Sequence, residues 1–149
     1  MKKSFIIFLA LVSFTWIQAQ ETVSFKFNHI ALSVKDVNQS AKFYKNVLQL
    51  QEITNRTKMD GIRWFSFGEN KELHLVSVVK EPVVINKAVH FALNTANFDA
   101  FINKLDAMKI DFSDWAGRRN KITTRADGIK QIYFQDPDGY WIEVNSVID

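Results

Sequence analysis

The feature that most constrains this chain is a short phrase that occurs twice. Residues 28–34 read NHIALSV and residues 89–95 read VHFALNT, so each copy places a histidine, an apolar residue, Ala and Leu before a small polar residue. The 149 residues contain only three histidines. A recurring phrase predicts a duplicated structural unit, and a scarce residue type shared by both copies indicates that the unit positions a functional group.

Each copy of the phrase opens the same order of predicted elements. A helix is expected from Asp36, whose spacing to Gln39 resembles a capping box, and a second helix is expected after Asn97. The second helix carries the clearer apolar stripe at positions i, i+3, i+4 and i+7. Three strand-like runs follow each helix. They lie in QEITNR, IRWFSFG and ELHLVSVV in the first half, and in KIDFSDW, IKQIYFQ and YWIEVNSV in the second.

The sequence therefore predicts an α+β domain of two tandem βαβββ modules. We expect one domain over residues 20–149, with a first module at about 25–79, a linker at 80–87 and a second module at about 88–148. The second half is longer because of the polar stretch 113–128. A stretch of this length is either a functional lid or a surface insertion.

The first 19 residues resemble a secretory signal peptide. Lys2 and Lys3 precede an almost unbroken apolar run from Phe5 to Trp16, and the small residue Ala19 follows where a signal peptidase cleaves. The run is short for a membrane span, and the alternative is a retained membrane anchor. We expect a secreted or periplasmic protein that has no membrane contact after cleavage.

Cysteine usage and charge narrow the function classes further. The chain has no cysteine, which fits an oxidising compartment and removes thiolates as metal ligands or nucleophiles. The formal net charge is +3, and the predicted signal peptide carries two of these positive charges. Because the remaining domain is close to neutral, no nucleic acid is expected as a partner.

Strand alternation places four ligand-type side chains in equivalent positions. Neighbours i and i+2 of a strand share a face, so His29 and His90 lie opposite their apolar neighbours in the first strand of each half. The same holds for His74 in ELHLV and Glu143 in YWIEVN, in the last strand of each half. Each residue alone also fits a structural or solvated role. Their recurrence favours a shared function.

On these residues the chain resembles the vicinal oxygen chelate superfamily. This superfamily includes glyoxalase I, fosfomycin-resistance transferases, methylmalonyl-CoA epimerase, extradiol dioxygenases and bleomycin-resistance proteins. The resemblance covers essentially all of the mature chain and implies an eight-stranded cup, with a divalent metal held between the modules. It rests on NHIALSVKDVNQSAKFYKNVL, ELHLV, VHFAL and IYFQDPDGYWIEV.

The resemblance also implies roles for the four ligand-type residues. Carried over by position, the metal ligands would be His29, His74, His90 and Glu143. Three imidazoles and a carboxylate suit one divalent transition metal (Zn, Ni, Fe, Mn or Co) better than Ca or Mg. Such a metal acts as a Lewis acid on a substrate that chelates it through adjacent oxygens. Glu143 and His74 are the candidate catalytic groups, with His74 either a ligand or an acid–base group.

The resemblance is strongest to the glyoxalase-like branch. We therefore expect a metal-dependent lyase or isomerase that acts on a small α-oxygenated metabolite, with a carboxylate that moves a proton between neighbouring carbons. His74 departs from glyoxalase I, which typically carries a glutamate there. An extradiol-type ring-cleaving dioxygenase is the first alternative. It would bind metal through His29, His90 and Glu143 and use His74 as acid–base catalyst.

Two further functions stay open. A fosfomycin-resistance-like transferase would use the same three ligands, although Ala31 stands where that group favours threonine. A non-catalytic drug-binding protein would hold its ligand in an aromatic-lined cleft. All four functions imply a small-molecule partner, and homodimers are common in the superfamily. The candidate substrate residues are Trp64, Trp115, Arg118, Arg119, Arg125 and Tyr133.

Overall fold

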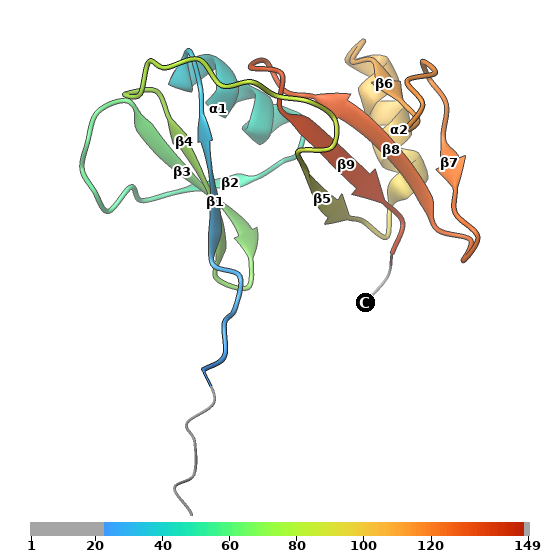
Figure 1. The fold of residues 1–149 in the computed structure, drawn as a ribbon, viewed down its shortest axis with the longest axis horizontal. Coiled ribbons are helices and arrows are strands. Elements are labelled where there is room, and N and C mark those ends of the chain that lie inside the picture. Colours follow the sequence, from blue (N-terminus) through green and yellow to red (C-terminus); the bar gives the residue numbers. More distant parts are fainter. Residues whose placement is uncertain (1–22, 148–149) are drawn as a thin grey trace, which may run out of the picture.

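Each histidine phrase opens a module of the fold. In the computed structural model, which describes residues 23–147, β1 (His29–Ser33) and β5 (His90–Asn94) begin at the two histidines. The two modules lie side by side, the first in blue to green and the second in olive to red (Figure 1). The predicted signal peptide, residues 1–19, lies outside the described residues. Within residues 23–147, no helix has the length and apolar character needed to cross a membrane.

The first module has the predicted βαβββ order. After β1 come α1 (Val37–Asn46), β2 (Gln51–Ile53), β3 (Ile62–Gly68) and β4 (Lys71–Val76). Asp36 caps α1, because its side chain accepts hydrogen bonds from the backbone N–H groups of Asn38 and Gln39 at 2.8 and 3.2 Å. The sheet order is β1-β4-β3-β2, with β1 parallel to β4.

The second module repeats this order and adds one short strand. It contains α2 (Phe98–Ala107), β6 (Phe112–Ser113), β7 (Thr123–Thr124), β8 (Lys130–Gln135) and β9 (Trp141–Asn145). Asn97 occupies the N-cap position of α2, as expected, but its side chain makes no capping hydrogen bond. The sheet order is β5-β9-β8-β6, and β7, from within the 113–128 stretch, also pairs with β8.

The strands form two sheets within the described chain, one of four strands and one of five. In the cup implied by the resemblance, the modules would enclose a common site. Here β1 and β5 are each the edge of their own sheet and pair on one side only, with β4 and β9. Within the described chain, β1 and β5 therefore each leave one row of backbone groups without a partner strand.

A shared core and one turn join the modules. Both helices contribute to a single cluster of buried apolar residues, and Phe43 of α1 lies 6.3 Å, centroid to centroid, from Phe134 of β8. The turn between β8 and β9 docks on α1: the Tyr44 hydroxyl donates to Asp136 at 2.7 Å, and the Ser40 hydroxyl donates to Asp138 at 2.6 Å. These contacts fix how the two sheets sit relative to each other.

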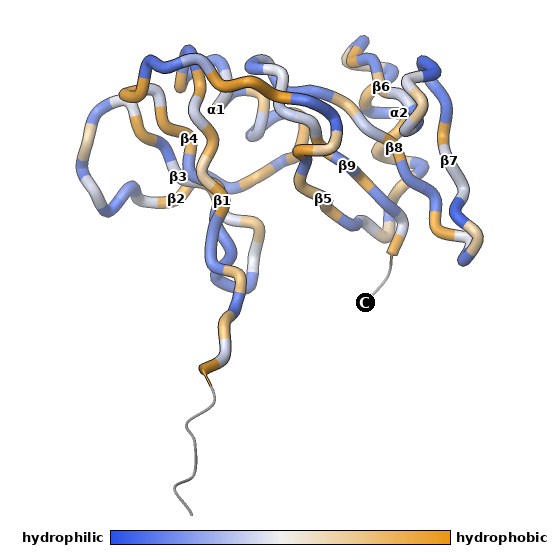
Figure 2. The backbone as a smooth tube through the Cα atoms, in the orientation of Figure 1, coloured by the Kyte–Doolittle hydropathy of each residue, from blue (hydrophilic) through white to orange (hydrophobic). Residues whose placement is uncertain are grey.

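The linker between β4 and β5 carries exposed apolar residues. It crosses the top of the molecule with hydrophobic colour along much of its length (Figure 2). Its exposed residues include Val83 and Val84, and Val84 is 92% exposed. An exposed apolar segment of this kind is typical of an interaction surface.

Candidate functional site

The first module contributes a column of stacked rings. Trp64 of β3 pairs with His74 of β4, and their rings stack with centroids 4.0 Å apart. His29 of β1 stacks on the other side of His74 at 4.3 Å. The histidine ring is thus sandwiched between two flat neighbours, and the three side chains share the face predicted from strand alternation.

Two polar partners orient the histidines of this column. His74 Nε2 lies 2.8 Å from a carboxylate oxygen of Glu72, and His29 Nδ1 lies 2.7 Å from the side-chain oxygen of Asn28. The hydrogen bonds and charges of His74 and Arg56 hold the pKa of Glu72 below its usual value, although partial burial opposes this effect. Sequence reasoning missed Glu72, yet its position two residues before His74 places it on the same face.

The second module contributes a buried carboxylate beside a histidine. Glu143 of β9 is only 8% exposed, and one of its oxygens lies 3.4 Å from His90 Nε2. The Tyr133 hydroxyl donates to the same carboxylate at 2.6 Å and itself accepts from the Gln131 amide at 3.0 Å. Asn145 donates to the other carboxylate oxygen at 3.2 Å. A carboxylate with this many donors is held in one position.

Burial and the hydrogen bond to Glu143 raise the pKa of the Tyr133 phenol. Arg125 acts in the opposite direction, because its positive charge favours the phenolate. The net direction is upward, so Tyr133 stays protonated and donates to Glu143 across the neutral pH range.

Lys87 of the linker contacts both His90 and the 113–128 stretch. Sequence reasoning missed this residue. Its carbonyl oxygen lies 2.9 Å from His90 Nδ1. Its ammonium donates to the carbonyl oxygens of Asp114 at 2.6 Å and Trp115 at 3.3 Å, and it lies over the Tyr133 ring at 5.0 Å. Burial lowers the pKa of Lys87, and the charge of Asp114 opposes this shift. No residue pattern in the sequence marks this lysine, since its contacts come from distant segments.

Trp115 forms the outer wall of this second group. Its ring lies 6.1 Å from that of His90 and 5.5 Å from that of Tyr133, centroid to centroid. Half of its surface is exposed, so it lies where this group meets solvent. The predicted substrate residues Trp115 and Tyr133 therefore lie together in the second module, while Trp64 lies in the first.

The three candidate arginines are engaged in ion pairs of their own. Arg118 pairs with the buried carboxylate of Asp114 at 2.6 Å, and Arg125 pairs with Asp127 at 2.6 Å. Arg119 pairs with Asp111. The charge of Arg125 also acts on the Tyr133 phenol.

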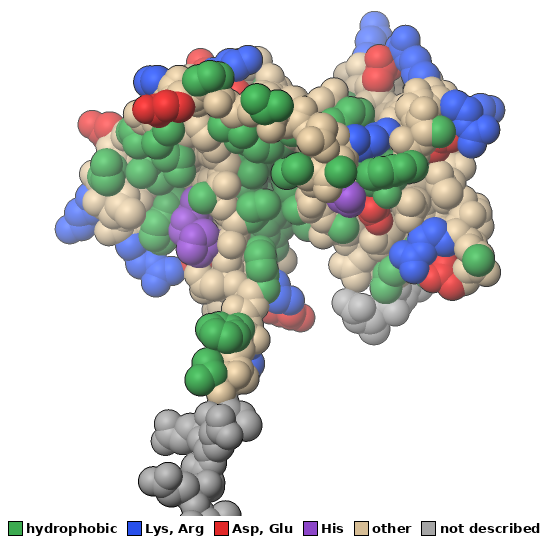
Figure 3. All heavy atoms as spheres, viewed as in Figure 1, with side chains coloured by type: hydrophobic (Ala, Val, Ile, Leu, Met, Phe, Trp, Pro, Cys, Tyr) green, Lys and Arg blue, Asp and Glu red, His purple; other side chains and the backbone are tan. Residues whose placement is uncertain are grey.

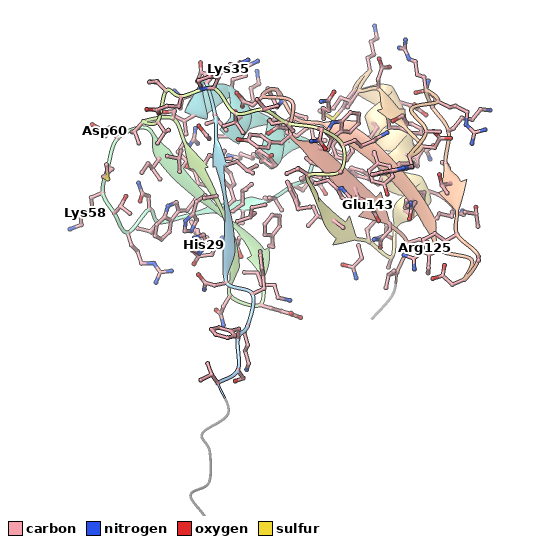
Figure 4. The ribbon with its side chains drawn as sticks, in the orientation of Figure 1. His29, Lys35, Lys58, Asp60, Arg125 and Glu143 are labelled. Carbon is pink, nitrogen blue, oxygen red and sulfur yellow. The ribbon has the colours of Figure 1, made fainter. Side chains whose placement is uncertain are left out.

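The structure brings the four predicted ligands together as two pairs. His29 and Glu143 lie on separate modules (Figure 4), and histidine side chains appear at two separate places on one face, with hydrophobic side chains between them (Figure 3). Within residues 23–147, no three or more His, Cys, Asp or Glu side chains are grouped so that they could hold one metal ion. We call the His29–His74 pair and the His90–Glu143 pair the two half-sites.

Each half-site has donor chemistry that fits a transition metal. One ring nitrogen of each histidine faces an oxygen: Asn28 for His29, Glu72 for His74 and the Lys87 carbonyl for His90. When that nitrogen carries the proton, the other nitrogen presents a lone pair, which is the usual arrangement of ligand histidines. The donors therefore fit a metal, but each half-site has only two of the four predicted ligands. That the four form one site stays a prediction.

Comparison with known proteins identifies the family. Residues 26–144 match the model of the Glyoxalase/Bleomycin resistance protein/Dioxygenase superfamily. The chain belongs to this superfamily. The vicinal oxygen chelate resemblance drawn from the sequence is thereby confirmed, and so is the α+β fold.

Curated superfamily relatives carry different activities in their names. The uncharacterized protein YwbC of Bacillus subtilis is 30% identical over 79% of this chain and 94% of its own. Glyoxylase I 4 of Arabidopsis thaliana is 24% identical over 78% and 68% of the two chains. The metallothiol transferase FosB of Shouchella clausii is 27% identical over 80% and 78%.

Among solved structures with a similar fold, the oxidase ChaP-H2 aligns with a TM-score of 0.69. It is 18% identical, and the alignment covers 85% of this chain and 96% of that one. At this identity the similarity concerns the fold. Proteins named as a glyoxylase, a transferase and an oxidase are thus similar to this chain, and the side chains of each site decide the activity.

Proposed function

We propose that this protein is a divalent-metal-dependent lyase or isomerase of the glyoxalase type that acts on a small α-oxygenated metabolite. The observation that carries the proposal is Glu143, a buried carboxylate fixed by Tyr133 and Asn145 beside His90. A carboxylate in a fixed position next to an imidazole is suited to moving a proton between neighbouring carbons. The relative named Glyoxylase I 4 supports this class.

We further propose that two chains complete each metal site. The half-sites lie on the same face of the molecule, one on each module (Figure 3). A second copy that faces this surface across a two-fold axis would place its His29–His74 pair opposite the His90–Glu143 pair of the first copy. The free edges of β1 and β5 and the exposed linker valines give such a contact backbone groups and apolar surface to bury.

In the completed site, the metal and the surrounding residues would have different roles in the reaction. A bound transition metal supplies Lewis acidity toward two adjacent substrate oxygens. Glu143 accepts the proton from one carbon and returns it to the next, while Tyr133 keeps the carboxylate aimed and Trp115 shields it from water. The second ring nitrogen of His90 stays anchored on the Lys87 carbonyl throughout.

A ring-cleaving dioxygenase is the second candidate, and His74 is the observation that favours it. Its hydrogen bond to the Glu72 carboxylate orients the ring, which suits the acid–base role that a dioxygenase would give His74 as well as a ligand role. The transferase receives less support, because the loop arginines that would hold an anionic substrate are already in ion pairs.

Turnover with oxygen uptake separates these candidates. The protein comprising residues 20–149, without a histidine tag, is loaded in turn with Zn, Ni, Fe, Mn or Co and offered α-hydroxycarbonyls and catechols. We expect isomerisation without oxygen consumption, lost by about a hundredfold or more in Glu143→Gln and retained in the control Glu81→Gln on the linker. Oxygen consumption with ring cleavage would replace the isomerase by the dioxygenase. No turnover by any loaded form would favour a binding protein.

Export is a separate part of the proposal and rests on the predicted signal peptide. Protein isolated from the host's extracellular or periplasmic fraction should begin at Gln20 by N-terminal sequencing. A chain that starts at Met1 and stays with the membrane would contradict it.

A further inference from the structure

A groove of about 560 Å³ lies between the modules, on the side of the helices. It is lined by the segment 47–50 after α1, by the end of β5 and by the first turns of α2. Val144 also lines it, whereas Glu143 belongs to the second half-site. Because successive side chains of a strand point to opposite faces, the groove and the half-site lie on opposite faces of the second sheet.

The lining of this groove is amphipathic. Its apolar part is built by Leu48, Leu50, Phe67, Leu93 and Phe101, among others. Polar side chains at its rim include Gln49, Thr95 and Asn97. Among the described residues that line it, Lys104 is the single charged one, and no carboxylate takes part. The groove therefore combines an apolar surface with one positive charge, and its volume is in the range of small-molecule sites.

Lys104 has no partner for its charge. Within residues 23–147, its ammonium takes part in none of the hydrogen bonds or ion pairs. It lies one helical turn after Ala100 and Phe101, which line the same groove. Partial burial lowers the pKa of Lys104, because the surroundings disfavour its charged form. A carboxylate bound beside it would compensate for that loss of hydration.

We propose that this groove binds a small amphiphilic monocarboxylate, with its alkyl chain on the apolar surface and its carboxylate at Lys104. The occupant is chosen by charge complementarity: a cation without a partner at an apolar groove selects an anion with an apolar body. The site is independent of the proposed metal chemistry, since none of its lining residues belongs to a half-site.

The test compares two ligands of equal chain length, octanoate and octan-1-ol, by isothermal titration calorimetry on residues 20–149. We expect saturable octanoate binding, weakened about tenfold or more in Lys104→Met, with octanol binding unchanged by that substitution. Lys42→Met, an exposed lysine on α1, is the matched control and should leave both affinities unchanged. Circular dichroism confirms that each variant is folded.

Three results would overturn the proposal. These are no saturable octanoate binding by wild type, equal octanoate affinity in wild type and Lys104→Met, or a groove that is covered by a second copy. The last would appear in sedimentation as a dimer that excludes octanoate and dissociates in Ala100→Arg. A His90→Ala variant should bind octanoate as wild type does, so failure of the metal-site proposal and failure of this one are distinguishable.

Discussion

The two modules use the same backbone positions for different chemistry. Ala31 pairs with His74 in the first sheet, and Ala92 pairs with Glu143 in the second, so His74 and Glu143 occupy equivalent positions. Their cross-strand neighbours are equivalent too: Trp64 faces His74, and Tyr133 faces Glu143. In the first module an indole stacks on an imidazole, whereas in the second a phenol donates to a carboxylate.

Duplication of the module therefore gives two equivalent positions on the sheets, and the side chains around each position determine what the residue there can do. His74 is sandwiched between the rings of Trp64 and His29, and the Glu72 carboxylate orients its ring. Glu143 is buried and held by several donors, so it can act only in the place where it is fixed. The first module thus offers a pair of stacked imidazoles and the second an imidazole beside a hydrogen-bonded carboxylate, so the two half-sites supply different donor groups from equivalent positions.

Among the substitutions that compare the two modules, removing the hydrogen bond between Tyr133 and Glu143 should have the largest effect on stability. Tyr133→Phe removes a buried hydrogen bond to a charged group, so we expect a loss of about 2 kcal/mol in the free energy of unfolding and about tenfold in turnover. The equivalent Trp64→Phe should cost about 1 kcal/mol or less, since a phenyl ring can still stack on His74 and only part of the indole packing and of its contact with Arg56 is lost. Urea unfolding of both variants measures the difference. Equal losses would mean that the two positions are equivalent in energy as well as in register.

The 113–128 stretch sharpens the comparison, because the first module has no counterpart to it. Lys87→Met removes the ammonium contacts to Ser113, Asp114 and Trp115. We expect hydrogen exchange of a peptide covering 113–128 to rise about fivefold, which corresponds to roughly 1 kcal/mol of local stability. Lys80→Met is the control, since that lysine bonds only within its own linker, to Ser77. Unchanged exchange in Lys87→Met would show that the lysine does not hold the stretch.

The smallest effect concerns β2 and β3 of the first module, which an ion pair connects. Arg63 donates twice to Glu52, at 2.7 and 2.6 Å, and this hydrogen bonding lowers the pKa of Glu52 below 4.5. The resulting stabilisation is present above the unfolded pKa and is lost as the pH falls through the lower folded pKa. Because both side chains are about one-third exposed, it amounts to less than about 1 kcal/mol.

Wild type and Glu52→Gln test this pH dependence by urea unfolding at pH 7 and pH 3. The difference between them should favour wild type at pH 7 and shrink toward zero at pH 3. A difference that stays constant with pH would show that the pair acts through packing rather than charge.

Much of the fold follows from local patterns. Strand alternation and the helical stripe depend on neighbouring residues, which is why the βαβββ order and the Asp36 cap were predictable. The placement of the modules depends on contacts such as Tyr44 with Asp136, which lie 92 residues apart. The periodicity of the sequence does not predict such distant contacts. The separation of the half-sites and the contacts of Lys87 could therefore be found only in the structure.

Complementation between two inactive chains tests the central claim most directly. One variant carries His29→Ala and His74→Ala, and the other carries His90→Ala and Glu143→Ala. If two chains complete each site, neither variant alone should hold metal, but a mixture refolded together should regain metal in its heterodimers, at up to one ion per heterodimer. Elemental analysis of the untagged mixture measures this. Metal retained by either variant alone, or no recovery in a mixture that sedimentation shows to contain heterodimers, would contradict a site shared between chains.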